Sequence, residues 1–133
     1  MSTIVKPARQ FFEACETGQG WDACKAFCVP DATFSAQAGA LAEISTLEGY
    51  TEWMKNLLTP IPDGHYELKF FAADEADTSV AAFAVFHGTQ TGEGGPVPAT
   101  GNKVAADYVY HMVFDGDRIK HMTKIWNDGH SLQ

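Results

Sequence analysis

Apolar residues near the start of the chain recur with the period of an α-helix. Between residues 8 and 15 they lie three and four positions apart, at Ala8, Phe11, Phe12 and Cys15. Side chains with this spacing share one face of a helix, so the pattern predicts a first helix. Pro7 suits its first turn, and Gly18 and Gly20 suit its end.

The next stretch predicts a short second helix and a brief strand. Trp21, Cys24 and Cys28 repeat the helical spacing, and this helix should end before the proline that follows, because the residue ahead of a proline avoids helical geometry. The two helices should form a hairpin. Residues 31–34 then predict a brief strand, and residues 37–44, which have no clear period, predict a loop.

A third helix has the fullest apolar stripe in the chain. Its positions are Tyr50, Trp53, Met54, Leu57 and Leu58. Ser45 followed three residues later by Glu48 resembles a capping box, which predicts where the helix begins. Pro60 and Pro62 should end it, because proline interrupts helical hydrogen bonding.

From residue 65 the pattern becomes that of β-strands. Four segments rich in Val, Phe, Tyr, Ile and Thr cover residues 66–73, 78–91, 103–114 and 118–128, with turn-forming residues between them. Their connections are too short for crossover helices, so neighbouring strands should pair antiparallel. The sequence therefore predicts an α+β fold: a curved antiparallel sheet, shaped like a cone, wraps around three N-terminal helices and leaves an internal pocket.

Length and charge narrow the function classes. The 133 residues should form one domain, residues 1–133. Nine Lys and Arg against 17 Asp and Glu give a net charge of −8, which argues against nucleic-acid binding, since that depends on basic residues. No apolar run approaches the roughly 20 residues that cross a bilayer, and the first residues lack an export signal. We therefore expect a cytoplasmic protein without a membrane partner.

The cysteines and the motif content predict no metal or cofactor. Cys15, Cys24 and Cys28 are an odd number without a C-x-x-C pair, so we expect buried free thiols. The histidines do not have zinc-finger spacing to them. Patterns typical of zinc proteases, phosphate-binding loops, calcium loops and serine hydrolases do not occur in the sequence.

The strand at residues 103–114 carries two very different rows of side chains. Strand residues alternate between the two faces of a sheet, so Asp107 and His111 share one row, and Tyr108 and Tyr110 share the other, more apolar row. Asp107 and His111 are candidate catalytic residues. A cavity can raise the pKa of an aspartate, and a carboxylate can orient a histidine for proton transfer. The alternative is that both lie on a solvent or dimer face.

Lys124 is the third candidate catalytic residue, and its partner depends on the preceding turn. A two-residue turn at positions 115–116 would set Asp107 opposite Lys124, whereas a three-residue turn would set Tyr108 opposite Lys124. Both registers stay open. Lys124 could act as a cation or as an amine of low pKa, or simply cover apolar surface with its stem.

The remaining candidates are aromatic, histidine and methionine side chains that could contact a flat ligand. They are Tyr50, Trp53, His87, Tyr108, Tyr110, Met122 and Trp126. Aromatic stripes at helical spacing usually belong to the core, so a purely structural role is the competing interpretation.

The order of elements, together with residues 88–93, 96–101 and 114–119, resembles the SnoaL-like polyketide cyclase and ester cyclase branch of the nuclear-transport-factor-2-like superfamily. The resemblance covers nearly the whole chain. It implies the cone-shaped fold, and it places Lys124 where these cyclases carry a catalytic Asp on the last strand. Gln90 stands where the cyclase branch often has a His.

Three hypotheses follow. The first is a cofactor-independent enzyme, of cyclase, isomerase or hydrolase type, that acts by general acid/base catalysis on a small, mostly apolar or aromatic, carbonyl-bearing molecule. The second is a non-catalytic ligand-binding module, suggested by Lys124 in place of the Asp. The third is a dimerising module, since the resemblance implies a homodimer through the open face of the sheet.

Overall fold

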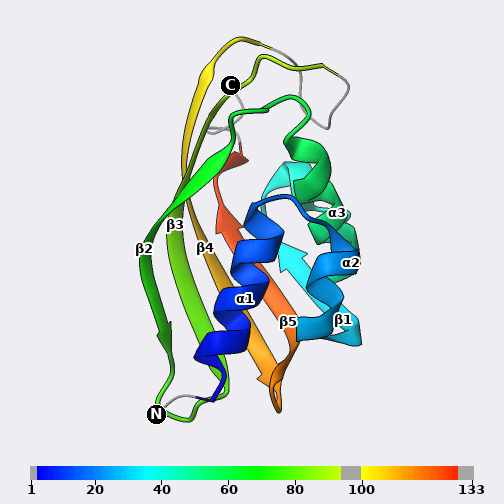
Figure 1. Cartoon of the computed structure of the whole chain (residues 1–133), viewed down its shortest axis with the longest axis vertical. Helices are drawn as coiled ribbons and strands as arrows, with labels where there is room; N and C mark the ends of the chain where they lie inside the picture. The colour runs from blue at the N-terminus through cyan, green and yellow to red at the C-terminus, as the bar shows by residue number, and fades with distance from the viewer. Residues whose placement is uncertain (1–2, 94–99, 129–133) are drawn as a thin grey trace.

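The helices and strands follow the predicted order. The computed structural model describes residues 3–93 and 100–128. Its helices are α1 (Val5–Glu16), α2 (Trp21–Cys24) and α3 (Leu47–Leu57), and its strands are β1 (Cys28–Ala36), β2 (His65–Ala73), β3 (Ser79–Thr89), β4 (Lys103–Asp115) and β5 (Arg118–Trp126). The helices cover one face of a curved, open sheet (Figure 1). The predicted α+β cone is confirmed.

The sheet is mixed rather than wholly antiparallel. Its strand order is β1-β5-β4-β3-β2, and the pairs from β2 to β5 are antiparallel, as predicted. β1, however, pairs with β5 in parallel, so the expectation of an antiparallel sheet is wrong at this edge. Short turns join only β2 to β3 and β4 to β5, so they do not constrain β1. Because α3 separates β1 from β2 in the sequence, β1 can pair with β5 in the parallel direction.

Two element boundaries also differ from the predictions. The second helix ends at Cys24 and continues as one 3-10 turn (Lys25–Phe27), so Cys28 begins β1 instead of ending a helix. The third helix is capped by Thr46, not Ser45: its hydroxyl accepts a hydrogen bond from the Gly49 amide at 3.0 Å. Of the turn-forming residues expected between the segments 78–91 and 103–114, residues 94–99 lie outside the described residues.

The turn between β4 and β5 has a register that neither prediction anticipated. Asp115 pairs with Arg118, so the two-residue turn falls one position later than expected, with Gly116 at a positive φ of 65°. After Val113 the register shifts, so the pairing of β4 with β5 moves by one more residue. As a result Lys124 lies opposite Tyr110. This pairing determines which side chains meet inside the cone.

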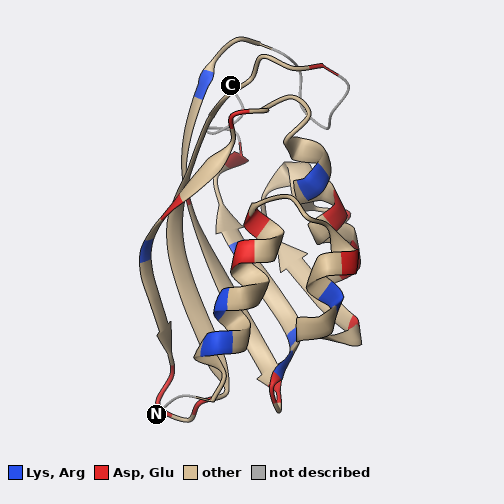
Figure 2. Ribbon diagram, in the orientation of Figure 1, with Lys and Arg blue, Asp and Glu red and all other residues tan. Residues whose placement is uncertain are grey.

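The core lies between the helices and the inner rows of β3, β4 and β5. On β4, burial alternates strictly, with the row from Val104 to Phe114 inside. All three cysteines are buried and free. β3 carries no Lys, Arg, Asp or Glu, whereas the helices, the turns and the other four strands do (Figure 2). No helix in the described residues is long and apolar enough to cross a membrane; the cytoplasmic location stays a prediction.

Replacing Phe12 by Ala should strongly destabilise the fold. The ring is fully buried and makes edge contacts with Tyr66, Phe71 and Tyr110. Loss of a buried phenyl group leaves a cavity, which lowers the free energy of unfolding by about 3–5 kcal/mol. Phe70→Ala is the matched control, because Phe70 is 56% exposed. Urea titration of both variants checks this; equal losses would contradict the packing described.

Candidate functional site

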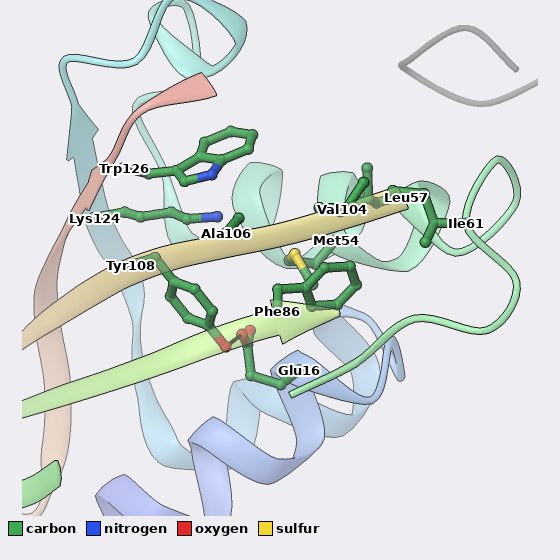
Figure 3. A pocket seen from close by; sticks show the side chains of 10 residues that line it. All are labelled: Glu16, Met54, Leu57, Ile61, Phe86, Val104, Ala106, Tyr108, Lys124 and Trp126. Carbon is green, nitrogen blue, oxygen red and sulfur yellow. Dashed lines mark hydrogen bonds between the residues drawn. The ribbon is translucent and has the colours of Figure 1, made fainter. Parts of the chain in front are cut away.

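A cavity opens inside the cone, between α1, α3 and the inner face of the sheet (Figure 3). It is lined by Glu16, Met54, Leu57, Ile61, Phe86, Val104, Ala106, Tyr108, Lys124 and Trp126. Most of the lining is apolar. The free space between these side chains is small, with room for about one water molecule. Any ligand larger than a water molecule would therefore have to move these side chains apart.

Three titratable side chains enter this apolar lining: Glu16, Tyr108 and Lys124. Glu16 is the last residue of α1 and is 2% exposed. Lys124 projects inward from near the end of β5 and is 5% exposed. Figure 3 shows the Tyr108 hydroxyl turned toward the Glu16 carboxylate, and Lys124 beside the indole of Trp126. An acid and an amine thus share one enclosed space.

Aromatic rings surround the Lys124 amine. Nζ lies 4.2 Å from the ring centroid of Trp126, and 5.2 to 5.7 Å from those of Tyr50, Trp53, Tyr108 and Tyr110. Ring faces at such distances attract a cation. Burial nevertheless dominates and lowers the pKa of Lys124 to about 8, although the negative charge of Glu16 acts in the opposite direction. A sizeable fraction of the amine is therefore neutral near physiological pH.

A chain of hydrogen bonds connects the amine to the carboxylate. Lys124 Nζ donates to the Tyr50 hydroxyl at 3.0 Å, and Tyr50 and Tyr110 share a hydrogen bond between their hydroxyls. Tyr110 in turn donates to Glu16 Oε2 at 2.7 Å. Tyr108 donates to the other oxygen, Oε1. Two tyrosines thereby link the only lysine and the only glutamate of the cavity lining.

Burial also shapes the acidity of the other members of this network. It raises the pKa of Glu16, while Lys124 and the two tyrosine donors act to lower it. It raises the pKa of Tyr50, Tyr108 and Tyr110 as well, and the charge of Glu16 adds to this. The tyrosines therefore stay protonated and serve as hydrogen-bond donors, leaving Glu16 and Lys124 as the groups that exchange protons.

The predicted pair Asp107 and His111 does not face the cavity. Both are exposed on the outer face of β4, because their row alternates with the buried row of Tyr108 and Tyr110. The expectation that they lie in the pocket is therefore wrong. Neither of the two registers considered for Lys124, opposite Asp107 or opposite Tyr108, is the one observed, because Lys124 lies opposite Tyr110. Their side chains point away from the hydrogen-bond network, on the opposite face of the sheet.

His87 is also outside the cavity. Its side chain is 34% exposed, its ring stacks on that of His65 at 5.3 Å, and Nε2 lies 3.2 Å from Glu67 Oε1. Met122 is buried in the core without lining the cavity. Gln90 is fully buried, and neither polar atom of its side chain has a hydrogen-bond partner in the described structure.

Among the other predicted residues, Tyr108, Lys124 and Trp126 line the cavity. Tyr50 and Tyr110 lie directly behind them as links of the hydrogen-bond chain, and Trp53 contacts Trp126 edge to face at 5.9 Å. The contacts of these side chains with a ligand stay a prediction. Within residues 3–93 and 100–128, no group of three or more His, Cys, Asp or Glu side chains is placed to hold a metal ion.

Glu16 was not predicted as a site residue from the sequence. The signal was present, because Glu16 follows Phe12 by four positions and continues the apolar stripe of the first helix. A carboxylate at a core position of an amphipathic helix should have been a candidate site residue, since a buried acid needs hydrogen-bond partners or a proton.

A family model identifies the chain directly. The model of the SnoaL-like domain matches residues 8–122. No curated protein matches the sequence.

Solved structures share the fold at low sequence identity. A proposed SnoaL-like polyketide cyclase from Jannaschia sp. CCS1 is 16% identical with a TM-score of 0.73, over 95% of this chain and 89% of that chain. IdmH, a proposed polyketide cyclase from Streptomyces antibioticus, is 18% identical with a TM-score of 0.73, over 98% and 95%. AclR, a proposed hydroxylase from Streptomyces galilaeus, is 19% identical with a TM-score of 0.72, over 92% and 74%. At these identities the likeness concerns the fold alone, whereas the domain match spans most of the sequence: the chain belongs to the SnoaL-like family.

Proposed function

We propose that the protein is a cofactor-independent enzyme that transfers protons on a small, mostly apolar, carbonyl-bearing molecule held in the cone. The observation that carries this proposal is the buried Lys124–Tyr50–Tyr110–Glu16 chain, which ends in an apolar cavity. Two structural neighbours are proposed polyketide cyclases, and polyketides are rich in carbonyl groups. Such carbonyl compounds have acidic hydrogens on the adjacent carbon.

Lys124 takes the central role in this mechanism. In its neutral form the amine removes a proton from the carbon next to the carbonyl group, and the resulting ammonium stabilises the negative charge that develops on the carbonyl oxygen. The family resemblance places a catalytic Asp at this position. A lysine can replace it as a base because burial brings its pKa to about 8. Glu16, reached through Tyr50 and Tyr110, exchanges protons with the amine.

A ligand-binding module without catalysis is the second candidate. The observation that favours it is that each titratable group of the cavity already has a hydrogen-bond partner within the network: Lys124, Tyr108 and Glu16 bond to tyrosines or to one another. Titration of small aromatic ketones against tryptophan fluorescence would detect binding, because Trp126 lines the cavity. Binding without any proton exchange would favour this second function.

Replacing Lys124 by Met should abolish proton exchange while the protein stays folded. Removal of a positioned base typically lowers a rate by about 100-fold or more. Glu16 can take up a proton when it loses its charged partner, since burial already raises its pKa. The measurement is exchange of carbon-bound hydrogen for deuterium, followed by NMR over a panel of small ketones and aldehydes.

Lys120→Met is the matched control for this test, because Lys120 lies on the same strand but is exposed. It should retain the wild-type rate. Asp107→Asn tests whether Asp107, a candidate catalytic residue in the sequence, takes part in the exchange. If Asp107→Asn abolished exchange and Lys124→Met did not, the base would have to be sought on the outer face of the sheet.

The exchange rate should rise with pH and level off above about 8. The base must be neutral to accept a proton, and the neutral fraction of Lys124 grows tenfold for each pH unit below its pKa of about 8. A pH profile of kcat/KM between 5.5 and 9.5 measures this. A rate that instead fell over the range from 6 to 8 would indicate that a protonated group starts the reaction, contrary to the proposed role.

The proposal includes a homodimer formed through the outer face of the sheet. Phe83, Val109 and Ile125 are neighbours across β3, β4 and β5, and all three side chains point outward. Ile125 is 63% exposed. A continuous apolar row on an exposed sheet face typically marks a protein interface, and the family resemblance supports a second copy of the chain as the partner.

Light scattering at micromolar concentrations should therefore give twice the mass of one chain. Ile125→Asp should reduce it to the mass of a monomer, because a charge in the centre of the interface would be buried without a partner. Lys55→Asp, an exposed position on α3, should stay dimeric. A wild-type protein that is monomeric under these conditions would refute the interface.

A further inference from the structure

Lys124 stands apart from the other lysines of the chain. All seven lysines lie in the described residues, and the other six are exposed. Lys124 is 5% exposed, and its amine reaches a cavity with otherwise apolar walls. A neutral amine in such a place is a nucleophile as well as a base, because no water shell or carboxylate shields its lone pair.

The hydrogen bonds of the network all run from the amine toward the carboxylate, so they form a path along which protons can move. Lys124 donates to Tyr50, and Tyr110 donates to Glu16. The Tyr110 hydroxyl hydrogen is thus committed to Glu16, so in the bond between the tyrosines Tyr50 is the donor. If each proton moves one step along this chain, Lys124 becomes an amine and Glu16 becomes a carboxylic acid. The net charge of the buried cluster does not change, and burial favours both neutral forms.

We propose that Lys124 forms a covalent imine with an aldehyde or ketone bound in the cavity. This inference rests on the proposed function, because it uses the same cavity and the same lysine. The nitrogen lone pair attacks the carbonyl carbon and gives a carbinolamine. The carbon–oxygen bond of the carbinolamine then breaks, and the oxygen leaves as water. The two protons of this water come from the nitrogen of Lys124. The hydroxyl and carboxyl groups of the network transfer them to the oxygen. A carbon–nitrogen double bond replaces the carbonyl group, and no oxidant or reductant is needed.

The surroundings of Lys124 suit such an adduct. A protonated imine is a cation, and the Trp126 ring, 4.2 Å from Nζ, would stabilise it as it stabilises the ammonium. The apolar lining from Met54, Phe86 and Val104 limits access of water, which would hydrolyse the imine. The same lining selects apolar carbonyl compounds, which must displace side chains to enter because the free space holds about one water molecule. Small aromatic aldehydes are the best-matched probes.

Reductive trapping tests the proposal. The full chain is incubated with benzaldehyde and sodium cyanoborohydride, then digested and analysed by mass spectrometry. One benzyl group should appear on the peptide that contains Lys124, ahead of labelling at the exposed lysines. Its rate should reach half its maximum near pH 8, the pKa of Lys124.

Two arginine variants serve as controls. Lys124→Arg should lose the selective label, and Lys120→Arg should keep it; circular dichroism establishes that both are folded. A label spread evenly over the exposed lysines, or absent from Lys124, overturns the imine. If deuterium exchange by the wild type persists in that case, the proposed proton transfer stands without the imine. If trapping succeeds but exchange is absent, the imine stands and the proposed reaction fails.

Discussion

The burial of one acid and one amine inside the same apolar cone is the constraint on which the site depends. Glu16 and Lys124 come from opposite ends of the chain and are both almost fully excluded from water. Removing a charge from water is costly unless the group is paired, hydrogen-bonded or neutralised. Tyr50, Tyr108 and Tyr110 meet this requirement, because their hydroxyls bond to both groups. These hydrogen bonds connect α1 to the inward-facing side chains of β4 and β5. The same contacts therefore hold α1 against the sheet and form the candidate site.

The register between β4 and β5 decides which residues belong to this network. Since side chains alternate along a strand, a shift of one residue would turn Tyr108 and Tyr110 outward and bring Asp107 and His111 inward. The turn at Gly116 and the register shift after Val113 together set Tyr110 opposite Lys124. A local feature of one hairpin thus selects a tyrosine–lysine site over an aspartate–histidine site.

The sequence predicted the architecture well and the site only in part, for a physical reason. Periodicity reports which face of an element is apolar, so α1, α3 and the four long strands could be located from patterns such as Phe11–Cys15. Periodicity does not determine the register between paired strands, and the hydrophobic pattern of the sequence does not mark the register shift after Val113. The parallel addition of β1 to β5 likewise depends on tertiary packing. Lys124 was identified because family resemblance marked its position, whereas Glu16 was overlooked because a charged residue on a helix is usually taken as solvent-facing.

The arrangement of the network has a consequence for the choice of ligand. A carboxylate at position 124 would place a negative charge directly in the cavity, whereas here the acid lies at the end of α1 and is covered by two tyrosine donors. The charged group at position 124 is instead an amine, and its extra proton can pass to Glu16 through Tyr50 and Tyr110. In the proposed reaction, the cavity therefore presents a neutral base to an uncharged ligand and a cation to the oxyanion formed from it, without any change in the total charge that is buried. An apolar cone tolerates such an internal exchange far better than the entry of a new ion, because only the position of a proton changes.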